Sequence, residues 1–403
     1  MTDRPFLSGV IEGFYGRPWS RRQRQELFGW LQRAGLNTYM YAPKDDLKHR
    51  ALWRAPYDPE ELAGIRELVG ACAAHGLDFL YAIAPGLDVR FTDDGDRQAL
   101  VAKVGSVAAL GVRHFALLFD DIPATLDPAD AARFVTPAAA QSDLANALLH
   151  ELCRQDGGVR LIFCPTAYCG RMAQPSVSQN PYLRELGRRL TPEIDVFWTG
   201  PHIVSDTIPV ESIRELAAVL GRLPVIWDNL FANDYDMRRL YLGPFAGRGP
   251  ELRGEVSGIL LNPNCQFEAN PVAVQTLGAY LAEAEGYAAE SAGERALAVW
   301  VQDFEPAVGE ALIMEELRLL ADFLHLPTEF GPGAKSFLEG LERLRRDSPV
   351  TWGEVAGEVA AVCVALNRIF DKLTCLKNRS LLHALYPHAW ELKEIGQFLQ
   401  VWM

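Results

Sequence analysis

Residues 7 to 43, LSGVIEGFYGRPWSRRQRQELFGWLQRAGLNTYMYAP, contain a strand, a helix and a second strand in that order. The two ends, LSGVIEG and NTYMYAP, are short apolar runs of the kind that form buried strands. The segment between them has apolar residues at helical spacing and closes at Gly35, where a helix C-cap belongs. A strand followed by a helix and another strand is the repeating unit of parallel α/β folds.

This unit recurs along the chain up to about residue 290. Eight apolar runs alternate with helical stretches: LSGVIEG (7–13), NTYMYAP (37–43), DFLYAIAPG (78–86), HFALLFDD (114–121), LIFCPTAY (161–168), DVFWTGP (195–201), PVIWDN (224–229) and GILLNPN (258–264). Eight strand-helix units predict a closed (β/α)8 barrel. The rival, a doubly wound open sheet, would carry a G-x-G-x-x-G loop after its first strand, and GFYGRPW does not supply one.

Beyond residue 290 the strand pattern stops. Segments such as EELRLLADFLHL and GEVAGEVAAVCVALNRIF have helical periodicity, and PTEFGPGAK marks a turn between two helices. We therefore predict an α/β fold with two parts, a (β/α)8 TIM barrel at residues 1–290 and a C-terminal α-helical domain at residues 291–403.

Charge and cysteine content exclude several classes of partner. The formal net charge of −13 disfavours nucleic acid and anionic membrane surfaces as partners. No apolar run is long enough to span a membrane, and no secretory signal is visible. The seven cysteines are scattered without a CxxC pair, which predicts reduced thiols in the cytoplasm and no metal site.

Polar residues follow nearly every apolar run, at the barrel face where reactive groups of such folds gather. They are Glu12, Tyr15, Lys44, Asp45, Asp46, Asp120, Asp121, Tyr168, Thr199, His202, Trp227, Asp228, Asn229, Asn262 and Asn264. The sharpest feature is the adjacent pair Asp120 and Asp121. Mutual repulsion and partial desolvation are expected to raise the pKa of one member, as a general acid requires. The alternative is a solvated loop or a helix-cap pair before Pro123.

Adjacent carboxylates do not suit the usual glycosidase arrangement, in which acid and nucleophile stand about 5 Å apart across the scissile bond. A 2-acetamido sugar removes this difficulty because its own amide oxygen can attack the anomeric carbon. One enzyme carboxylate then needs only to orient and polarise the amide N–H.

Other strand ends fit a sugar ligand. Tyr168 and Trp227 offer rings to the C–H faces of a sugar, although packing at the barrel top is an equal alternative. Lys44 could donate to a hydroxyl, and Asn229, Asp234 and Asn262 supply acceptors. Each of these alone could instead be a surface residue or satisfy loop backbone groups. Asp45 and Asp46 look like solvated charges at a helix start.

The same segments resemble glycoside hydrolase family 84, the O-GlcNAcase family. The matching motifs run in order from about residue 8 to 270: GVIEGFYGRPW, LNTYMYAPKDDLKHR, YAIAPGLD, FALLFDDI, FCPTAYCG, VSQNPYLRELG, FWTGP, PVIWDNLFANDYD, LGPFAGR and LNPNCQFEAN. The resemblance implies a retaining mechanism through an oxazoline intermediate and no cofactor. It assigns Asp120 to the acetamido group and Asp121 to general acid and base catalysis.

The resemblance also implies binding roles. It places Gly13, Lys44, Asp234 and Asn262 at sugar hydroxyls, and Tyr168, Trp227 and Asn229 around the N-acetyl group. One departure is Ala167 in PTAYCG, where the family often has an acidic residue. The C-terminal helices are similar only loosely, so a homodimer formed through them is a hypothesis.

We therefore predict an exo-β-N-acetylglucosaminidase that hydrolyses terminal β-linked GlcNAc, such as O-GlcNAc on Ser or Thr of proteins. One rival is cleavage of hyaluronan or chitin fragments, of which polyanionic hyaluronan is disfavoured by the acidic chain. The other is a catalytically silent glycan-binding barrel, which the intact pair Asp120 and Asp121 argues against.

Overall fold

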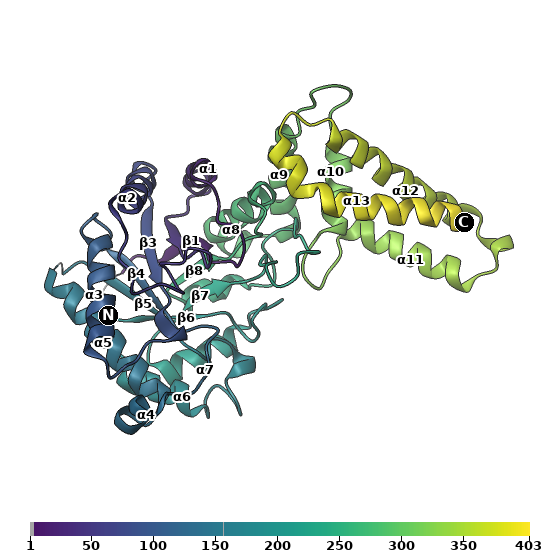
Figure 1. The fold of residues 1–403 in the computed structure, drawn as a ribbon. Coiled ribbons are helices and arrows are strands. Elements are labelled where there is room, and N and C mark those ends of the chain that lie inside the picture. Colours follow the sequence, from purple (N-terminus) through teal and green to yellow (C-terminus); the bar gives the residue numbers. More distant parts are fainter. Residues whose placement is uncertain (1–3, 156) are drawn as a thin grey trace. The chain divides into compact units, whose positions relative to one another are not determined.

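The centre of the fold is a closed barrel of eight parallel strands, each paired with the next in sequence and the last with the first (Figure 1). The computed structural model describes residues 4–155 and 157–403. The strands are β1 (Leu7–Glu12), β2 (Thr38–Tyr41), β3 (Asp78–Ile83), β4 (His114–Leu118), β5 (Arg160–Cys164), β6 (Asp195–Trp198), β7 (Val225–Asp228) and β8 (Gly258–Leu261). The predicted barrel is confirmed, and the open-sheet alternative is excluded.

Helices surround the barrel because parallel strands are joined by crossovers that cover the outer face of the sheet. They are α1 (Arg21–Arg33), α2 (Pro59–Ala74), α3 (Asp94–Ala108), α4 (Pro128–Phe134), α5 (Pro137–Gln155), α6 (Pro181–Arg189) and α7 (Val210–Leu220). Capping boxes start two of them, at Ser20 with Gln23 and at Asp58 with Glu61. The link from β7 to β8 departs from the regular pattern, since its described helical part is the short 3₁₀ helix η3 (Pro250–Gly254).

The barrel interior is filled by side chains from alternate positions of the strands. One apolar cluster consists of residues at the strands and their carboxyl ends, among them Leu7, Met40, Leu80, Ile162 and Phe197. Residues between these, such as Tyr39 and Phe115, face the helices. Both faces of each strand are therefore buried, as expected for a parallel barrel.

The chain divides into two compact units that do not follow one cut in the sequence. The first comprises Met1–Ala232 and Gly247–Pro263, and the second Asn233–Ala246 and Asn264–Met403. The predicted boundary between residues 290 and 291 thus falls inside the second unit, in α9 (Ala289–Trp300). Helix α8 (Pro271–Glu283), which follows the last barrel strand, also belongs to the second unit.

The second unit is helical, as predicted for the C-terminal part. Its later helices are α10 (Met314–Phe323), α11 (Pro332–Arg346), α12 (Gly353–Thr374) and α13 (Arg379–Trp402). Trp300, Leu317, Leu373 and Leu385 lie in its main apolar core. The expected turn at PTEFGPGAK joins α10 to α11. Within residues 4–155 and 157–403, no helix has both the length and the apolar character to cross a membrane.

Candidate active site

Five predicted site residues continue the inward-facing rows of their strands. Side chains along a strand alternate between two faces, so a residue two positions past an inward-facing one also points inward. The interior apolar cluster includes, at the ends of five strands, Ile11, Ala42, Leu118, Trp227 and Leu260. Two positions further along the chain are Gly13, Lys44, Asp120, Asn229 and Asn262. The barrel thereby gathers these residues, which we call the mouth ring, above its apolar interior.

The centre of the mouth ring is a buried ion pair. Nζ of Lys44 donates to Oδ2 of Asp120 at 2.6 Å, with side-chain exposures of 3% and 11%. Burial alone would raise the pKa of Asp120, but the Lys44 ammonium outweighs it and holds that pKa below its ordinary value. Asp120 is therefore a carboxylate at neutral pH, and it does not have the raised pKa expected for one member of the acidic pair.

Asp121 is held differently from its neighbour. Its φ of 54° lies in the left-handed region, so its side chain leaves the regular alternation of β4. Two phenols bind its carboxylate: Tyr168 donates to Oδ1 at 2.9 Å and Tyr15 to Oδ2 at 3.1 Å. Burial and the adjacent Asp121 raise the pKa of Tyr15 to about 12 and that of Tyr168 further, so both phenols keep their protons at neutral pH.

The other three residues of the mouth ring are an amide pair, Asn229 and Asn262, and Gly13, which lies next to the indole of Trp227. Nδ2 of Asn262 donates to Oδ1 of Asn229 at 2.9 Å, and Nδ2 of Asn229 donates to the Ile203 carbonyl at 2.8 Å. Trp227 is 6% exposed. A Cβ atom at Gly13 would lie 2.8 Å from Cζ2 of Trp227, so only glycine leaves room for the indole there.

Two acceptor atoms of the mouth ring are buried without a hydrogen-bond donor. They are Oδ1 of Asp120 and Oδ1 of Asn262; among the described residues, four further buried side-chain polar atoms lack a hydrogen-bond partner. An unsatisfied buried polar group costs about 1–3 kcal/mol, so such atoms call for an explanation. A ligand that brings N–H and O–H donors to the mouth ring supplies one.

Several other strand-end residues have structural partners instead. Glu12 binds both Nε and Nη2 of Arg24 at 2.7 Å, and Asp228 binds Nε and Nη2 of Arg248 at 2.8 and 2.7 Å. Glu12 and Asp228 each lie next to an inward-facing residue, so they point away from the barrel axis. Thr199 donates to the His202 carbonyl at 2.8 Å. These groups stabilise the outer layer and the loops.

The remaining predicted residues fall into three groups. Asp234 and Asn264 belong to the second unit. Asp234 lies in its segment Asn233–Ala246, and Asn264 begins its longer segment, Asn264–Met403. Asp45 is exposed. Asp46 does not start a helix, since α2 begins at Pro59; its carboxylate accepts hydrogen bonds from Tyr41 and Tyr57 at 3.0 and 3.1 Å.

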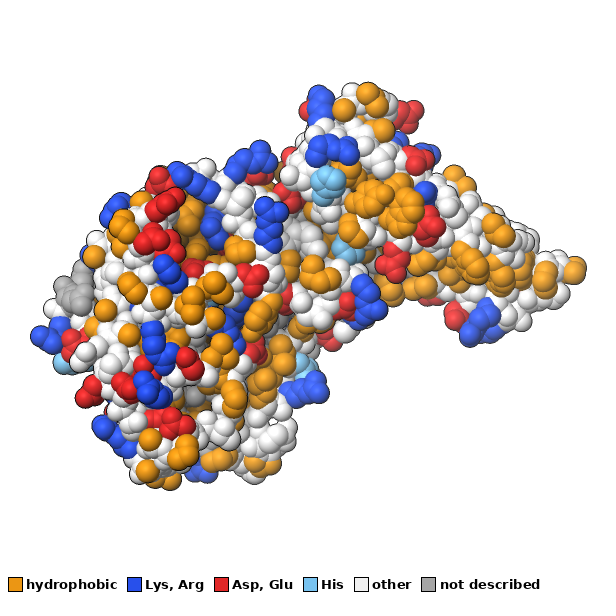
Figure 2. Space-filling view, viewed as in Figure 1, with side chains coloured by type: hydrophobic (Ala, Val, Ile, Leu, Met, Phe, Trp, Pro, Cys, Tyr) orange, Lys and Arg blue, Asp and Glu red, His pale blue; other side chains and the backbone are white. Residues whose placement is uncertain are grey.

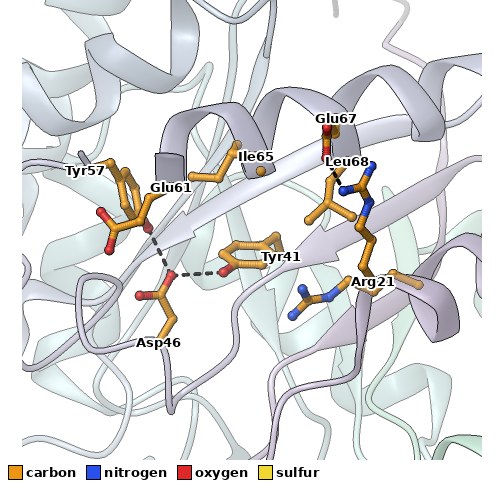
Figure 3. A pocket seen from close by; sticks show the side chains of 10 residues that line it. Arg21, Tyr41, Asp46, Tyr57, Glu61, Ile65, Glu67 and Leu68 are labelled. Carbon is orange, nitrogen blue, oxygen red and sulfur yellow. Dashed lines mark hydrogen bonds and ion pairs between the residues drawn. The ribbon is translucent and has the colours of Figure 1, made fainter. Parts of the chain in front are cut away.

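A pocket of about 290 Å³ lies away from the mouth ring, between α1 and α2 (Figure 3). Its charged groups already have partners. Asp46 accepts from Tyr41 and Tyr57, and Arg21 pairs with Glu67. Arg24 and Glu61 pair with residues outside the pocket, Glu12 and Lys48. The mouth ring, by contrast, has buried acceptors without donors. We therefore take the mouth ring as the candidate functional site.

Arg50 is a residue at this site that the sequence did not indicate. It is 8% exposed, and its Nη2 donates to the backbone carbonyl of Asp121 at 3.3 Å. It lies in the irregular segment between β2 and α2, where no strand alternation exists to predict its direction. Only the folded chain brings it to Asp121.

Comparison with known proteins identifies the family to which this barrel and its acidic pair belong. A family model described as beta-N-acetylglucosaminidase matches residues 8–314. The chain belongs to the β-N-acetylglucosaminidase family. The resemblance to glycoside hydrolase family 84, and with it the expected enzyme class, is confirmed.

Named relatives of this family member are mammalian and bacterial. Protein O-GlcNAcase of Rattus norvegicus is 50% identical over 277 residues, 69% of this chain and 30% of that protein. The Mus musculus protein O-GlcNAcase gives the same values, so the match spans about 30% of the length of both curated relatives. A mutant Thermobaculum terrenum O-GlcNAc hydrolase has a similar structure, with a TM-score of 0.86 and 28% identity, over 98% of this chain and 83% of that one.

Proposed function

We propose that this β-N-acetylglucosaminidase family member is a retaining exo-glycosidase that removes terminal β-linked GlcNAc, such as O-GlcNAc on Ser or Thr of proteins. The observation that carries the proposal is the contrast within the acidic pair. Asp120 is kept charged by a buried lysine, whereas its neighbour Asp121 is turned by a left-handed backbone and bound by two phenols. Two adjacent carboxylates in different surroundings suit two different tasks.

In the first step, the Asp120 carboxylate accepts a hydrogen bond from the acetamido N–H of the substrate. This contact would satisfy the buried Oδ1 and make the amide oxygen more nucleophilic. That oxygen forms a bond to the anomeric carbon as the glycosidic C–O bond breaks. Asp121 donates its proton to the departing oxygen, and the sugar becomes an oxazoline in which Asp120 balances the positive charge.

In the second step, Asp121 acts as the base. It takes a proton from a water molecule, whose oxygen bonds to the anomeric carbon while the oxazoline C–O bond breaks and the acetamido group re-forms. Two displacements at the same carbon retain the β configuration. Tyr15 and Tyr168 stay protonated throughout and hold the carboxyl group of Asp121 in place in both of its roles.

The remaining residues of the mouth ring, together with Trp227, Tyr168 and Asp234, would recognise the sugar. We assign Lys44 and Asn262 to its hydroxyls, because the ammonium has N–H donors and Oδ1 of Asn262 is a buried acceptor. Gly13 leaves room for Trp227, whose ring, with Tyr168 and Asn229, would enclose the N-acetyl group. Asp234 is proposed as a further acceptor for hydroxyls on the strength of its motif, PVIWDNLFANDYD.

Hydrolysis of an aryl N-acetyl-β-glucosaminide and of an O-GlcNAc peptide tests this proposal. We expect release of GlcNAc, with Asp121→Asn and Asp120→Asn each lowering kcat/KM by about 10²-fold or more. The matched control is Asp45→Asn, an exposed acid of the loop that carries Lys44. Full activity of Asp121→Asn would refute the assignment, as would equal hydrolysis of a glucoside without the acetamido group.

Two rival functions make different predictions. A chitin- or hyaluronan-cleaving enzyme would cut within a polymer, whereas an exo-enzyme releases monosaccharide from chain ends. A silent glycan-binding barrel would bind the sugar tightly without turnover. Product analysis over time, together with calorimetric binding of GlcNAc, separates the three.

A cytoplasmic location and a homodimer are further parts of the proposal. All seven cysteines are free thiols, which suits a reducing compartment. In the second unit, α13 exposes a group of large apolar side chains, and Figure 2 shows such side chains along its helices. They are Trp390, Ile395, Phe398, Val401 and Trp402. We propose a second copy as their partner, because one apolar face can pair with itself about a two-fold axis.

Light scattering at micromolar concentration tests the dimer. The wild type should have the mass of two chains, and Phe398→Glu that of one. A monomeric wild type would refute it. Gln400→Glu, at an exposed position two residues from Phe398 and therefore on the opposite side of the same helix, is the control for the added charge.

A further inference from the structure

We infer that Arg50 is a positioning residue for Asp121: its guanidinium holds the Asp121 carbonyl and the Tyr15 ring together and so fixes the direction of the proton-transferring carboxylate. The inference rests on the proposed role of Asp121. Arg50 ends the motif LNTYMYAPKDDLKHR, which by itself gives this arginine no role at the site. Its support comes from the backbone, from Tyr15 and from the surroundings of the guanidinium.

The first support is the backbone of Asp121. A φ of 54° is unfavourable for a residue with a side chain, and such conformations persist only where the surroundings enforce them. Nη2 of Arg50 donates to the Asp121 carbonyl at 3.3 Å, at the peptide that leaves this left-handed residue. A rotation of that peptide would break the hydrogen bond. Arg50 therefore favours the one backbone conformation that takes the Asp121 side chain out of the regular alternation of β4.

The second support is the contact with Tyr15. The Arg50 guanidinium carbon lies 5.9 Å from the centroid of the Tyr15 ring, within the range of a cation–π interaction. The hydroxyl of the same ring donates to Oδ2 of Asp121. Arg50 thus contacts the main chain of Asp121 directly, through the carbonyl. It acts on the Asp121 side chain indirectly, through Tyr15, which binds the carboxylate. Because Tyr15 is 43% exposed, it depends on such contacts for a fixed orientation.

The third support is that Arg50 is itself fixed. The preceding residue, His49, is bound to the end of β3: its Nδ1–H donates to the Ala82 carbonyl at 2.8 Å, and the Ala84 N–H donates to its carbonyl at 2.9 Å. Strand β3 pairs with β4, which leads to Asp121. Arg50 therefore bridges two adjacent strand ends with little freedom of its own.

Burial of the Arg50 guanidinium also costs free energy that its contacts must offset. Arg50 is 8% exposed, and its Nη1 is buried without a hydrogen-bond acceptor. Burying a charge with unsatisfied donors is unfavourable, so packing alone does not explain an arginine here. A loop that needed only an anchor has one in Arg54, which binds Asp88 and Asp96.

The leaving group of the substrate provides a test that separates positioning from general damage. A 2,4-dinitrophenyl glycoside departs without a proton, whereas a methyl glycoside requires one from Asp121. For Arg50→Met, which keeps the aliphatic stem, we expect kcat/KM on the methyl N-acetyl-β-glucosaminide to fall about 10- to 100-fold. On the dinitrophenyl substrate the loss should stay below about threefold. Arg50→Gln provides a second variant should Arg50→Met fail to fold.

The matched control is Arg54→Met, which removes a guanidinium from the same loop without touching Asp121. It should affect both substrates equally. Equal losses on the two substrates for Arg50→Met, or no loss, would overturn the inference. An inactive wild type would instead refute the proposed function. In that case a crystal structure of the Arg50 variant still decides, because an unchanged Asp121 φ and an unchanged Tyr15 contact would contradict positioning.

Discussion

Lys44 and Asp120 come from different strand ends, 76 residues apart in sequence, yet Nζ and Oδ2 lie 2.6 Å apart and both side chains are buried. The pair sets the charge of the proposed acetamido-binding carboxylate. Burial opposes ionisation of Asp120, and the ammonium reverses that preference.

Replacing Lys44 by methionine should therefore shift the pH dependence of the reaction. Without the ammonium, burial raises the pKa of Asp120, and the ionised form needed for catalysis is lost as the pH falls. We expect the acid limb of kcat/KM to move to higher pH, with a loss about tenfold greater at pH 5 than at pH 7. Lys48→Met, in the same loop but paired with Glu61, should keep the wild-type profile. An unchanged acid limb in Lys44→Met would contradict this account.

Tyr168→Phe removes one of the two phenol donors to Asp121. A hydrogen bond to a charged group contributes about 1.5–3 kcal/mol, so kcat/KM should fall at least about tenfold. The melting temperature should change little, because the ring remains. The control is Tyr287→Phe in the second unit, whose hydroxyl binds the Phe245 carbonyl. Wild-type activity in Tyr168→Phe would show that Tyr15 alone holds the carboxylate.

Gly13→Ala should disturb the proposed N-acetyl pocket by displacing Trp227. The new Cβ would lie 2.8 Å from both Cγ2 of Ile11 and Cζ2 of Trp227, so the indole must move. Overpacking of this kind costs about 1–3 kcal/mol of stability, and displacement of Trp227 should also raise KM. Gly70→Ala is the control: its Cβ would meet nothing within 4 Å in helix α2, and it should stabilise the fold slightly.

His49 should make stability dependent on pH. Burial and the nearby Lys44 lower its pKa from 6.5 to about 4 in the folded protein. Between these values the unfolded chain binds more protons, so the contribution is complete above pH 6.5 and is lost as the pH falls toward 4. Going from pH 7 to pH 5 should remove about 2 kcal/mol of unfolding free energy through His49.

Urea denaturation at both pH values measures this effect. His49→Gln should lose correspondingly less stability on acidification than the wild type. His150→Gln, at a side chain that is 73% exposed, should follow the wild type. A His49→Gln variant as sensitive to acid as the wild type would refute the argument.

The fold was predictable because hydrophobic runs mark each strand regardless of which face is buried. The same property limited the prediction of the site. In LSGVIEG both faces are apolar, so the sequence does not distinguish the inward row, which leads to Gly13, from the outward row, which ends at Glu12. Glu12 and Asp228 therefore looked equivalent to Lys44 and Asn229 until the structure separated the two faces.

Side-chain contacts between different strand ends could not be predicted from the sequence either. Adjacent carboxylates predicted a raised pKa for one member, but the effect of Lys44 on Asp120 depends on the register of strands far apart in the chain. The bridging of β3 and Asp121 by Arg50 depends on an irregular loop, for which no periodicity exists. The helical character of the second unit was predictable from the sequence, whereas the inclusion of residues 233–246 in that unit was not.

The inclusion of residues 233–246 in the second unit limits how the chain can be truncated. The chain passes from one compact unit to the other three times, so no single scission yields an intact barrel alone. A fragment ending at Pro263 would keep Tyr241, Leu242 and Phe245 but lose Asn264, Leu324 and Thr276, to which their backbones are hydrogen-bonded. Such a fragment would carry an apolar, unpaired loop prone to aggregation, and replacing residues 233–246 with a short hydrophilic linker would also remove Asp234.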